Sequence, residues 1–137
     1  MMRRLTLAFV LVAAMSGGPA MAQDASDDIR AVISEQIEAF RADDFERAFT
    51  YASPMIKRMF GDSVRFGRMV REGYPMVWRP SDVRFSGLSE RGGRTVQSVL
   101  VKDGSGALYI VDYEMIAEGD GWRINGVRVR RSGAAGA

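Results

Sequence analysis

Apolar residues recur at spacings of three and four in the part of the chain that follows residue 28. This spacing places them on one face of a helix over residues 29–40. The same spacing predicts shorter helices over residues 45–52, 54–60 and 63–73. The apolar face of the first helix consists of Ile29, Val32, Ile33, Ile37 and Phe40.

Candidate capping residues precede the three shorter helices. Asp43 stands three residues before Glu46, which is the spacing of a capping box. Ser53 is followed directly by a proline, a residue that suits the first position of a helix. Either Asp62 or Ser63 can cap the next helix. These signals divide the helical half of the chain into separate elements.

After Pro80 the apolar period changes from about 3.6 to two, which is typical of strands. Short turns that contain glycine separate four such segments, and turns this short join antiparallel neighbours. Helices followed by strands predict an α+β domain, with N-terminal helices packed on an antiparallel sheet of four to five strands. The four segments cover residues 83–90, 95–103, 107–117 and 122–131.

The tight turn at residues 118–121 determines how the last two strands pair. It places Met115 opposite Ile124, and directly opposed residues share one face of a sheet. Val127 joins that inner face only if a β-bulge at residues 125–126 inserts one extra residue.

A second bulge is expected at residues 86–87, because it keeps Leu88 in phase with Phe85. Two bulges in one small sheet curve it strongly. A strongly curved sheet around a helix encloses a cone, and we expect a cavity at the wide end of that cone.

The same pairing assigns side chains to the outer face of the sheet. Asp112 and Glu114 are expected there as cross-strand partners of arginines, and not as catalytic carboxylates. The outer face also carries an apolar patch, which either packs under a helix end or forms a homodimer interface, and the interface is the favoured prediction. The patch consists of Val99, Val101, Leu108 and Ile110.

The N-terminal residues have the three-part pattern of a secretory signal peptide. Two arginines precede an apolar run over residues 5–14, and small residues before Gln23 predict cleavage after Ala22. The run is well under the roughly 20 residues that span a bilayer, so we expect no stable membrane anchor after signal removal. The expected divisions are a signal peptide (1–22), a single α+β cone domain (23–131) and a flexible tail (132–137), located in the periplasm or secreted.

Charge and composition exclude several classes of function. The 137 residues include 19 Lys and Arg and 17 Asp and Glu. Without the 22 residues of the signal peptide, which carry Arg3 and Arg4, the remaining 115 have 17 of each sign. A protein with balanced charges does not need a polyanionic partner, so we expect no nucleic-acid partner. The chain has no Cys and no His, so we expect no zinc site, no His-dependent triad, no metal and no cofactor.

Three blocks of sequence carry a resemblance to a known family. They read IRAVISEQIEAFRADDFERAFTYASPMIKRMFG, FGRMVREGYPMVWRP and DYEMIAEGDGWRINGV. The chain resembles domain of unknown function 4864, a family of small bacterial exported or periplasmic proteins. Its architecture is similar to the nuclear transport factor 2-like, cystatin-like cone superfamily. The resemblance implies a curved sheet around a long N-terminal helix, and it implies no known activity and no catalytic residue.

Aromatic residues near the junction of helices and sheet are the candidate ligand-binding residues. A cone mouth lined by aromatic rings suits a small, partly apolar ligand, and an arginine there would bind an anionic group. The hypothetical pocket consists of Tyr74, Trp78, Arg79, Tyr113 and Trp122. The alternative for each aromatic residue is a place in the packed core. We expect Trp78 to be buried, residues 76–79 to be extended, and Tyr74 or Arg79 to face the cavity.

Three functions stay open at this point. The first is a noncatalytic domain that binds a small ligand or a partner. The second is an enzyme of the proton-transfer or elimination type, which needs a general acid or base in the cavity. The third is a homodimeric protein-interaction subunit. The candidate acids and bases for the enzyme are limited to Tyr113, Tyr51 and a helix carboxylate such as Asp44 or Glu38.

Overall fold

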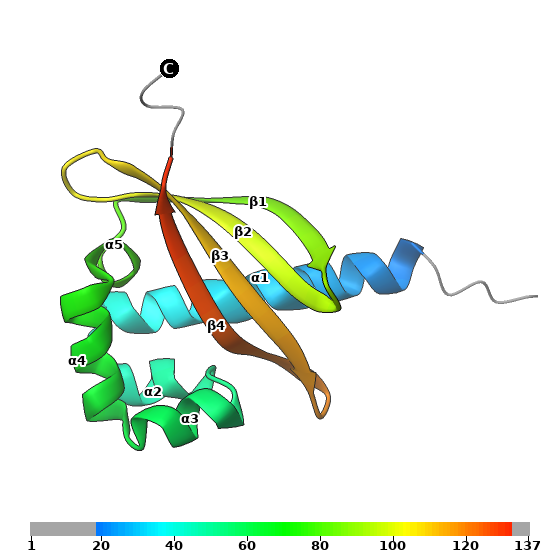
Figure 1. Ribbon diagram of the computed structural model, residues 1–137, viewed down its shortest axis with the longest axis horizontal. Coiled ribbons are helices and arrows are strands. Elements are labelled where there is room, and N and C mark those ends of the chain that lie inside the picture. Colours follow the sequence, from blue (N-terminus) through cyan, green and yellow to red (C-terminus); the bar gives the residue numbers. More distant parts are fainter. Residues whose placement is uncertain (1–18, 133–137) are drawn as a thin grey trace, which may run out of the picture.

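Helices come first along the chain and strands second in the computed structural model, which describes residues 19–132 (Figure 1). The α+β class is therefore confirmed. Within these residues, five helices form a layer against a four-stranded antiparallel sheet. The helices are α1 (Pro19–Arg41), α2 (Phe45–Thr50), α3 (Pro54–Phe60), α4 (Ser63–Gly73) and α5 (Pro75–Trp78). The strands are β1 (Asp82–Arg91), β2 (Arg94–Lys102), β3 (Leu108–Glu118) and β4 (Gly121–Arg131).

Helix α1 contains the whole segment that the apolar period assigned to a helix, and it crosses behind the sheet in Figure 1. Its buried side chains include Ile29, Ile33, Ile37 and Phe40, which follow the predicted spacing. Residues 1–18 of the predicted signal peptide lie outside the described residues, and its last four residues belong to α1. Within residues 19–132, no helix combines the length and the apolar character needed to cross a membrane.

Helices α3 and α4 begin where their predicted capping residues place them. Ser53 accepts a hydrogen bond from the backbone N–H of Ile56, and Asp62 accepts one from that of Arg65. The cap of α2 is Asp44, one residue later than predicted, and it accepts from the N–H of Arg47. Asp43 was the wrong candidate because its backbone has a φ of 54°, a left-handed conformation that ends α1.

Residues 75–78 form one turn of helix, so the prediction of an extended segment was wrong. Pro75 occupies the first helical position, where its fixed φ favours the helix and its missing N–H costs nothing. The N–H groups of Val77 and Trp78 both donate to the carbonyl of Tyr74. The turn buries Val77 and leaves Trp78 half-buried, so Trp78 is less buried than expected.

The strands follow one another in the sheet in the order β1-β2-β3-β4, so the sheet is an open antiparallel meander with β1 and β4 at its edges. Both predicted bulges are confirmed, one between Phe85 and Leu88 and one opposite Glu114–Met115. Met115 faces Ile124 as predicted. Asn125 is the extra residue of the second bulge.

The predicted interface patch is wrong in its first two members. Val99 and Val101 pair with Val111 and Tyr109, and they are 0% and 1% exposed against the helices. The expected pairing with Leu108 and Ile110 is offset by one residue, and an offset of one moves a side chain to the other face. Leu108 and Ile110 do lie on the outer face, where Ile110 pairs with Leu100.

The segment between α2 and α3 is bonded to the edge of β4. The N–H of Ile124 donates to the carbonyl of Tyr51, and the N–H of Ser53 donates to the carbonyl of Ile124. Ala52 and Ile124 thereby form a short parallel bridge. The side chain of Ser53 also donates to Oδ1 of Asn125 at 2.8 Å. These bonds hold α3 beside β4 and set the width of the space between them.

Candidate functional site

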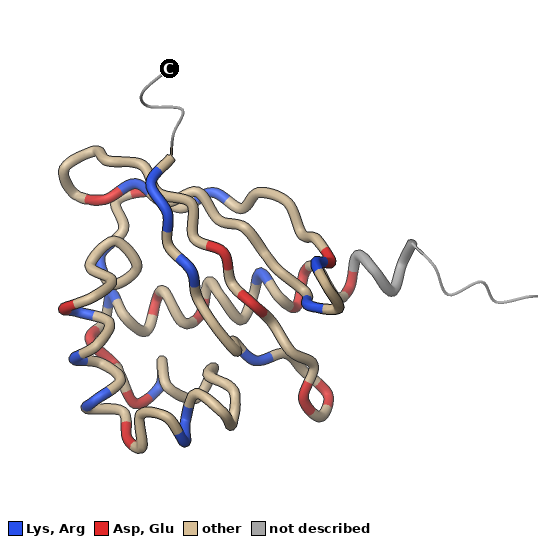
Figure 2. Tube along the Cα trace, in the orientation of Figure 1, with Lys and Arg blue, Asp and Glu red and all other residues tan. Residues whose placement is uncertain are grey.

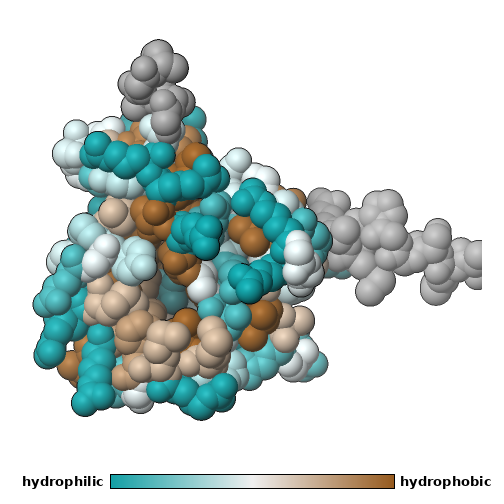
Figure 3. Space-filling model, viewed as in Figure 1, coloured by the Kyte–Doolittle hydropathy of each residue, from teal (hydrophilic) through white to brown (hydrophobic). Residues whose placement is uncertain are grey.

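A cavity of about 410 Å³ lies where α1, α3 and α4 meet the edge strand β4. Figure 3 shows apolar side chains gathered over the centre and lower part of this face of the molecule. The cavity wall combines the side chains of helices and strand with the backbone at the β4 bulge. Its lining residues are Gln36, Phe40, Ala52, Met55, Ile56, Met59, Phe60, Phe66, Met69, Val70, Tyr74, Val77, Ile124, Asn125, Gly126 and Val127.

Three methionines line the cavity. Met55 is 43% exposed and Met59 is 65% exposed, although both are apolar, while Met69 is half-buried. Met55 and Met59 are four residues apart on α3, so they lie on one side of that helix. Methionine side chains are flexible and polarizable, and proteins use them where a surface must adapt to apolar partners. The mouth of the cavity is therefore apolar and adaptable.

The polar groups of the wall are uncharged. Gln36 is buried and donates from Nε2 to the carbonyl of Ala48 at 3.1 Å. Asn125 accepts from Ser53 and donates from Nδ2 to Glu114 at 3.3 Å. Tyr74 supplies the third polar side chain. Among the described residues, no Asp, Glu, Lys or Arg lines this cavity, so the cavity suits an uncharged, apolar group.

Tyr74 is the one predicted pocket residue that lines the cavity. Trp78 and Arg79 instead bind Asp43 at the end of α1. Trp78 Nε1 donates to Asp43 Oδ1 at 3.0 Å, and Arg79 Nη2 donates to the same oxygen at 2.8 Å. Arg79 Nη1 also donates to the carbonyl of Phe40 at 2.7 Å. Arg79 is thus committed to joining α1 and α5, and is not placed to hold an anionic ligand in the cavity.

Electrostatics agree with this role for Asp43. The hydrogen bond from Trp78, assisted by the charge of Arg79, holds the pKa of Asp43 below its ordinary value. The guanidinium of Arg79 also stacks 4.4 Å from the centre of the Trp78 ring. We call Asp43, Trp78 and Arg79 the α1–α5 latch.

Tyr113 and Trp122 belong to the core and its margin. Tyr113 is fully buried on the helix side of the sheet, where it pairs with Gln97 on β2 and Val127 on β4. Burial raises the pKa of Tyr113. Its hydroxyl and Oε1 of Gln97 have no hydrogen-bond partner among the described residues. Trp122 is half-buried at the start of β4 and packs against the core.

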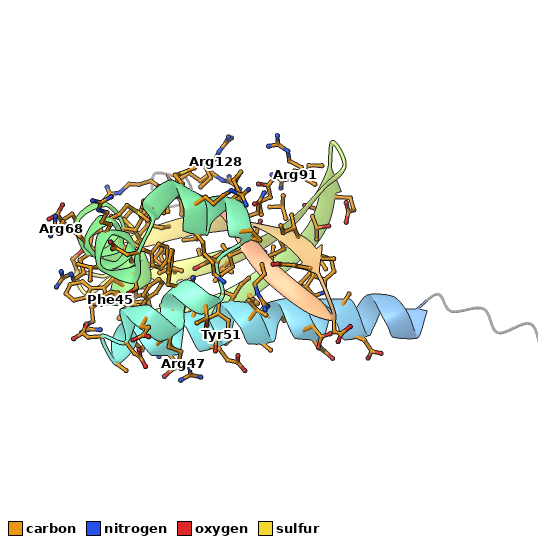
Figure 4. All side chains as sticks on the ribbon, turned by 90° about the horizontal axis from the view of Figure 1, so that it is seen from below. Phe45, Arg47, Tyr51, Arg68, Arg91 and Arg128 are labelled. Atoms are coloured by element: carbon orange, nitrogen blue, oxygen red, sulfur yellow. The ribbon has the colours of Figure 1, made fainter. Side chains whose placement is uncertain are left out.

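The candidate acids and bases lie away from the cavity wall. Asp44 caps α2, and Glu38 is exposed and forms an ion pair with Arg41 at 2.9 Å. Figure 4 shows Tyr51 and Arg47 together on the α1–α2 side of the molecule. General acid–base catalysis would need an acid or a base in the cavity wall. No carboxylate of the described residues lines the cavity.

The opposite face of the sheet carries a groove of about 580 Å³ that the sequence reasoning did not anticipate. Figure 4 shows Arg91 and Arg128 projecting from this face, away from α1, and Figure 2 shows charged residues along its strands. We call this hollow the arginine groove. Its lining residues are Arg91, Gly92, Arg94, Val96, Asp112, Glu114, Gly126, Val127 and Arg128.

Both carboxylates of the arginine groove point outward, as predicted. Asp112 accepts from Ser98 Oγ at 2.6 Å and pairs with Arg130 at 3.3 Å. Asp112 is nonetheless only 9% exposed. Glu114 pairs with Arg94 at 3.2 Å. No cluster of three acidic, His or Cys side chains occurs in the described part of the chain.

Comparison with known proteins identifies one family. The family model described as a domain of unknown function (DUF4864) matches residues 22–137. No curated protein matches the chain.

Proposed function

Because this chain belongs to the family described as a domain of unknown function (DUF4864), its function must be argued from its geometry, and we propose that it is a noncatalytic binding domain for a small apolar ligand. The observation that supports this proposal is the cavity of about 410 Å³ with its neutral, methionine-rich wall. That volume lies within the range of pockets that hold small ligands.

The exposed methionines support the same proposal. An apolar side chain that stays exposed loses the free energy that burial would provide, and Met59 is 65% exposed at the cavity mouth. A bound apolar ligand would cover Met55 and Met59 and recover part of that free energy. The neutral lining favours binding over proton transfer, because none of the described acidic or basic side chains lines the cavity.

The proposal includes a cone-like architecture and an extracytoplasmic location. The order of helices and strands and the two bulges support a nuclear transport factor 2-like cone. The pattern of residues 1–22 supports export to the periplasm or beyond the cell. A domain of this kind would meet its ligand outside the cytoplasm.

Titration with Nile red, an uncharged apolar dye, tests the proposal. We expect saturable binding by the wild-type protein and about tenfold weaker binding by Met59→Glu, because the variant places a charge at the mouth of an apolar site. Val64→Glu is the matched control, because Val64 is 67% exposed on α4 and does not line the cavity. Equal binding by Met59→Glu and Val64→Glu, or no binding by the wild type, would contradict the proposal.

Native mass spectrometry of protein purified from its own cells complements the dye. A retained small molecule that Met59→Glu loses and Val64→Glu keeps would identify the ligand directly.

A further inference from the structure

The apolar cavity and the arginine groove share two wall residues, Gly126 and Val127. Both residues belong to β4, which is an edge strand. The cavity opens on the side of β4 that faces the helices, and the groove lies on its other side. The two hollows are therefore separated by one strand, at its bulge.

Gly126 is one of the two residues that line both hollows. It follows the extra residue of the bulge and contributes only backbone to the shared wall. A Cβ atom at this position would lie 3.2 Å from Oε2 of Glu114, which is closer than most such contacts. A glycine here therefore leaves room for the Glu114 side chain and adds no side chain to the wall between the two hollows.

Arginines outnumber carboxylates among the residues that line the arginine groove. Its two carboxylates are each paired, Asp112 with Arg130 and Glu114 with Arg94. Within the described residues, Arg91 and Arg128 form no ion pair, although both line the groove and are exposed. Guanidinium groups bind carboxylates and phosphates through paired hydrogen bonds. The groove is therefore suited to an anionic group, and the cavity beside it is suited to an apolar one.

We propose that the ligand is an anionic amphiphile, with its alkyl chain in the cavity and its carboxylate or phosphate head in the arginine groove near Arg128. This inference rests on the function proposed above and narrows its ligand class. The sequence pattern predicted Arg79 as the anion-binding arginine. The guanidinium of Arg79 is instead engaged in the α1–α5 latch. Arg128 lies one residue beyond Val127 and so stands at the boundary of the two hollows.

Displacement of Nile red by three ligands with the same alkyl chain tests the inference. The ligands are dodecanoate, dodecyl phosphate and the uncharged dodecanol. We expect the wild-type protein to prefer each anion over dodecanol by about tenfold, which is the size of one charge-assisted contact at a partly exposed site. Raising the salt concentration should reduce this preference, because ions screen exposed charges.

Variants locate the head group. Arg128→Gln should reduce the anion preference to about twofold, since the charge is removed and part of the hydrogen bonding stays. Arg68→Gln is the control and should keep the full preference. Arg68 is an exposed arginine on α4, outside both hollows, and Figure 4 shows it at the far end of the molecule from Arg91.

The outcomes separate the two proposals. If dodecanol competes as well as dodecanoate and Arg128→Gln changes nothing, the anionic head group is wrong while the apolar site stands. If inorganic phosphate alone binds as tightly as dodecyl phosphate by calorimetry, the groove is a free-anion site and the amphiphile is wrong. If no ligand with an alkyl chain displaces the dye, the proposed function itself is wrong.

Discussion

The two faces of the sheet use the same strands for opposite purposes. Five consecutive residues of β3, from Val111 to Met115, alternate between the two faces. Val111, Tyr113 and Met115 are buried against the helices and carry no charge. Asp112 and Glu114 face the arginine groove. A strand period of two is thus enough to place an apolar cavity and a charged groove within one strand of each other.

The difference between the faces also shows how charge is tolerated. On the helix side, the buried side chains of β2 and β3 are uncharged. On the outer side, Asp112 is almost as buried, but a serine hydroxyl and an arginine satisfy its oxygens. Burial alone therefore does not separate the two faces. The available partners do.

The largest expected effect on stability comes from a charge introduced on the helix side of the sheet. Val99→Asp should lower the free energy of unfolding by about 4 kcal/mol or more, since Val99 is fully buried among apolar side chains. Leu100→Asp should cost about 1 kcal/mol or less, because Leu100 lies on the outer face and is partly exposed. Urea denaturation followed by circular dichroism measures both. Similar losses would show that the two faces do not differ as described.

A smaller effect should follow from removing a satisfied charge on the outer face. Asp112→Ala should cost about 1–2 kcal/mol, because Ser98 and Arg130 lose their acceptor and the carboxylate is nearly buried. Glu118→Ala is the control, since its pair with Arg123 spans 3.9 Å and both side chains are substantially exposed. We expect less than about 0.5 kcal/mol for the control. An Asp112 loss no greater than that of Glu118 would mean that the buried carboxylate contributes nothing.

The smallest effect concerns the margin of the helix layer, at the α1–α5 latch. The pKa of Asp43 is lowered from 3.8 in the folded protein, so its contribution to stability is present above pH 3.8. That contribution is lost as the pH falls through the folded-state pKa. In a Trp122→Phe background, the emission of Trp78 should therefore change with a midpoint below pH 3.8. Asp43→Asn should abolish the transition, and a midpoint above 3.8 would contradict the latch.

The pairing of β3 with β4 was predictable because its turn is tight and its apolar residues alternate cleanly. Met115 opposite Ile124 and the bulge at Asn125 followed from that phase. The pairing of β2 with β3 was not predictable in the same way. Val99, Leu100 and Val101 are all apolar, so the sequence pattern does not distinguish one face from the other. The error of one residue moved Val99 and Val101 to the wrong side.

The candidate site was predicted only in part for a related reason. Tyr74 was found because it stands at the junction of helices and sheet. Trp78 and Arg79 stand there too, but their partner Asp43 is 35 and 36 residues away, and nothing in the local pattern indicates that contact. Met55 and Met59 share one side of a capped helix, which was visible in the sequence. That this side faces β4 depends on hydrogen bonds between the α2–α3 segment and Ile124.

Those hydrogen bonds have a consequence for solubility. An edge strand offers unpaired N–H and C=O groups to any other extended chain, and this is how sheets of different molecules join. The N–H and the carbonyl of Ile124 are already engaged by Tyr51 and Ser53. Farther along β4, Arg128, Arg130 and Arg131 bring like charges to the edge. The edge of β4 is thus closed by backbone at Ile124 and carries like charges toward its end, and both features oppose the joining of protein copies through β4 at high concentration.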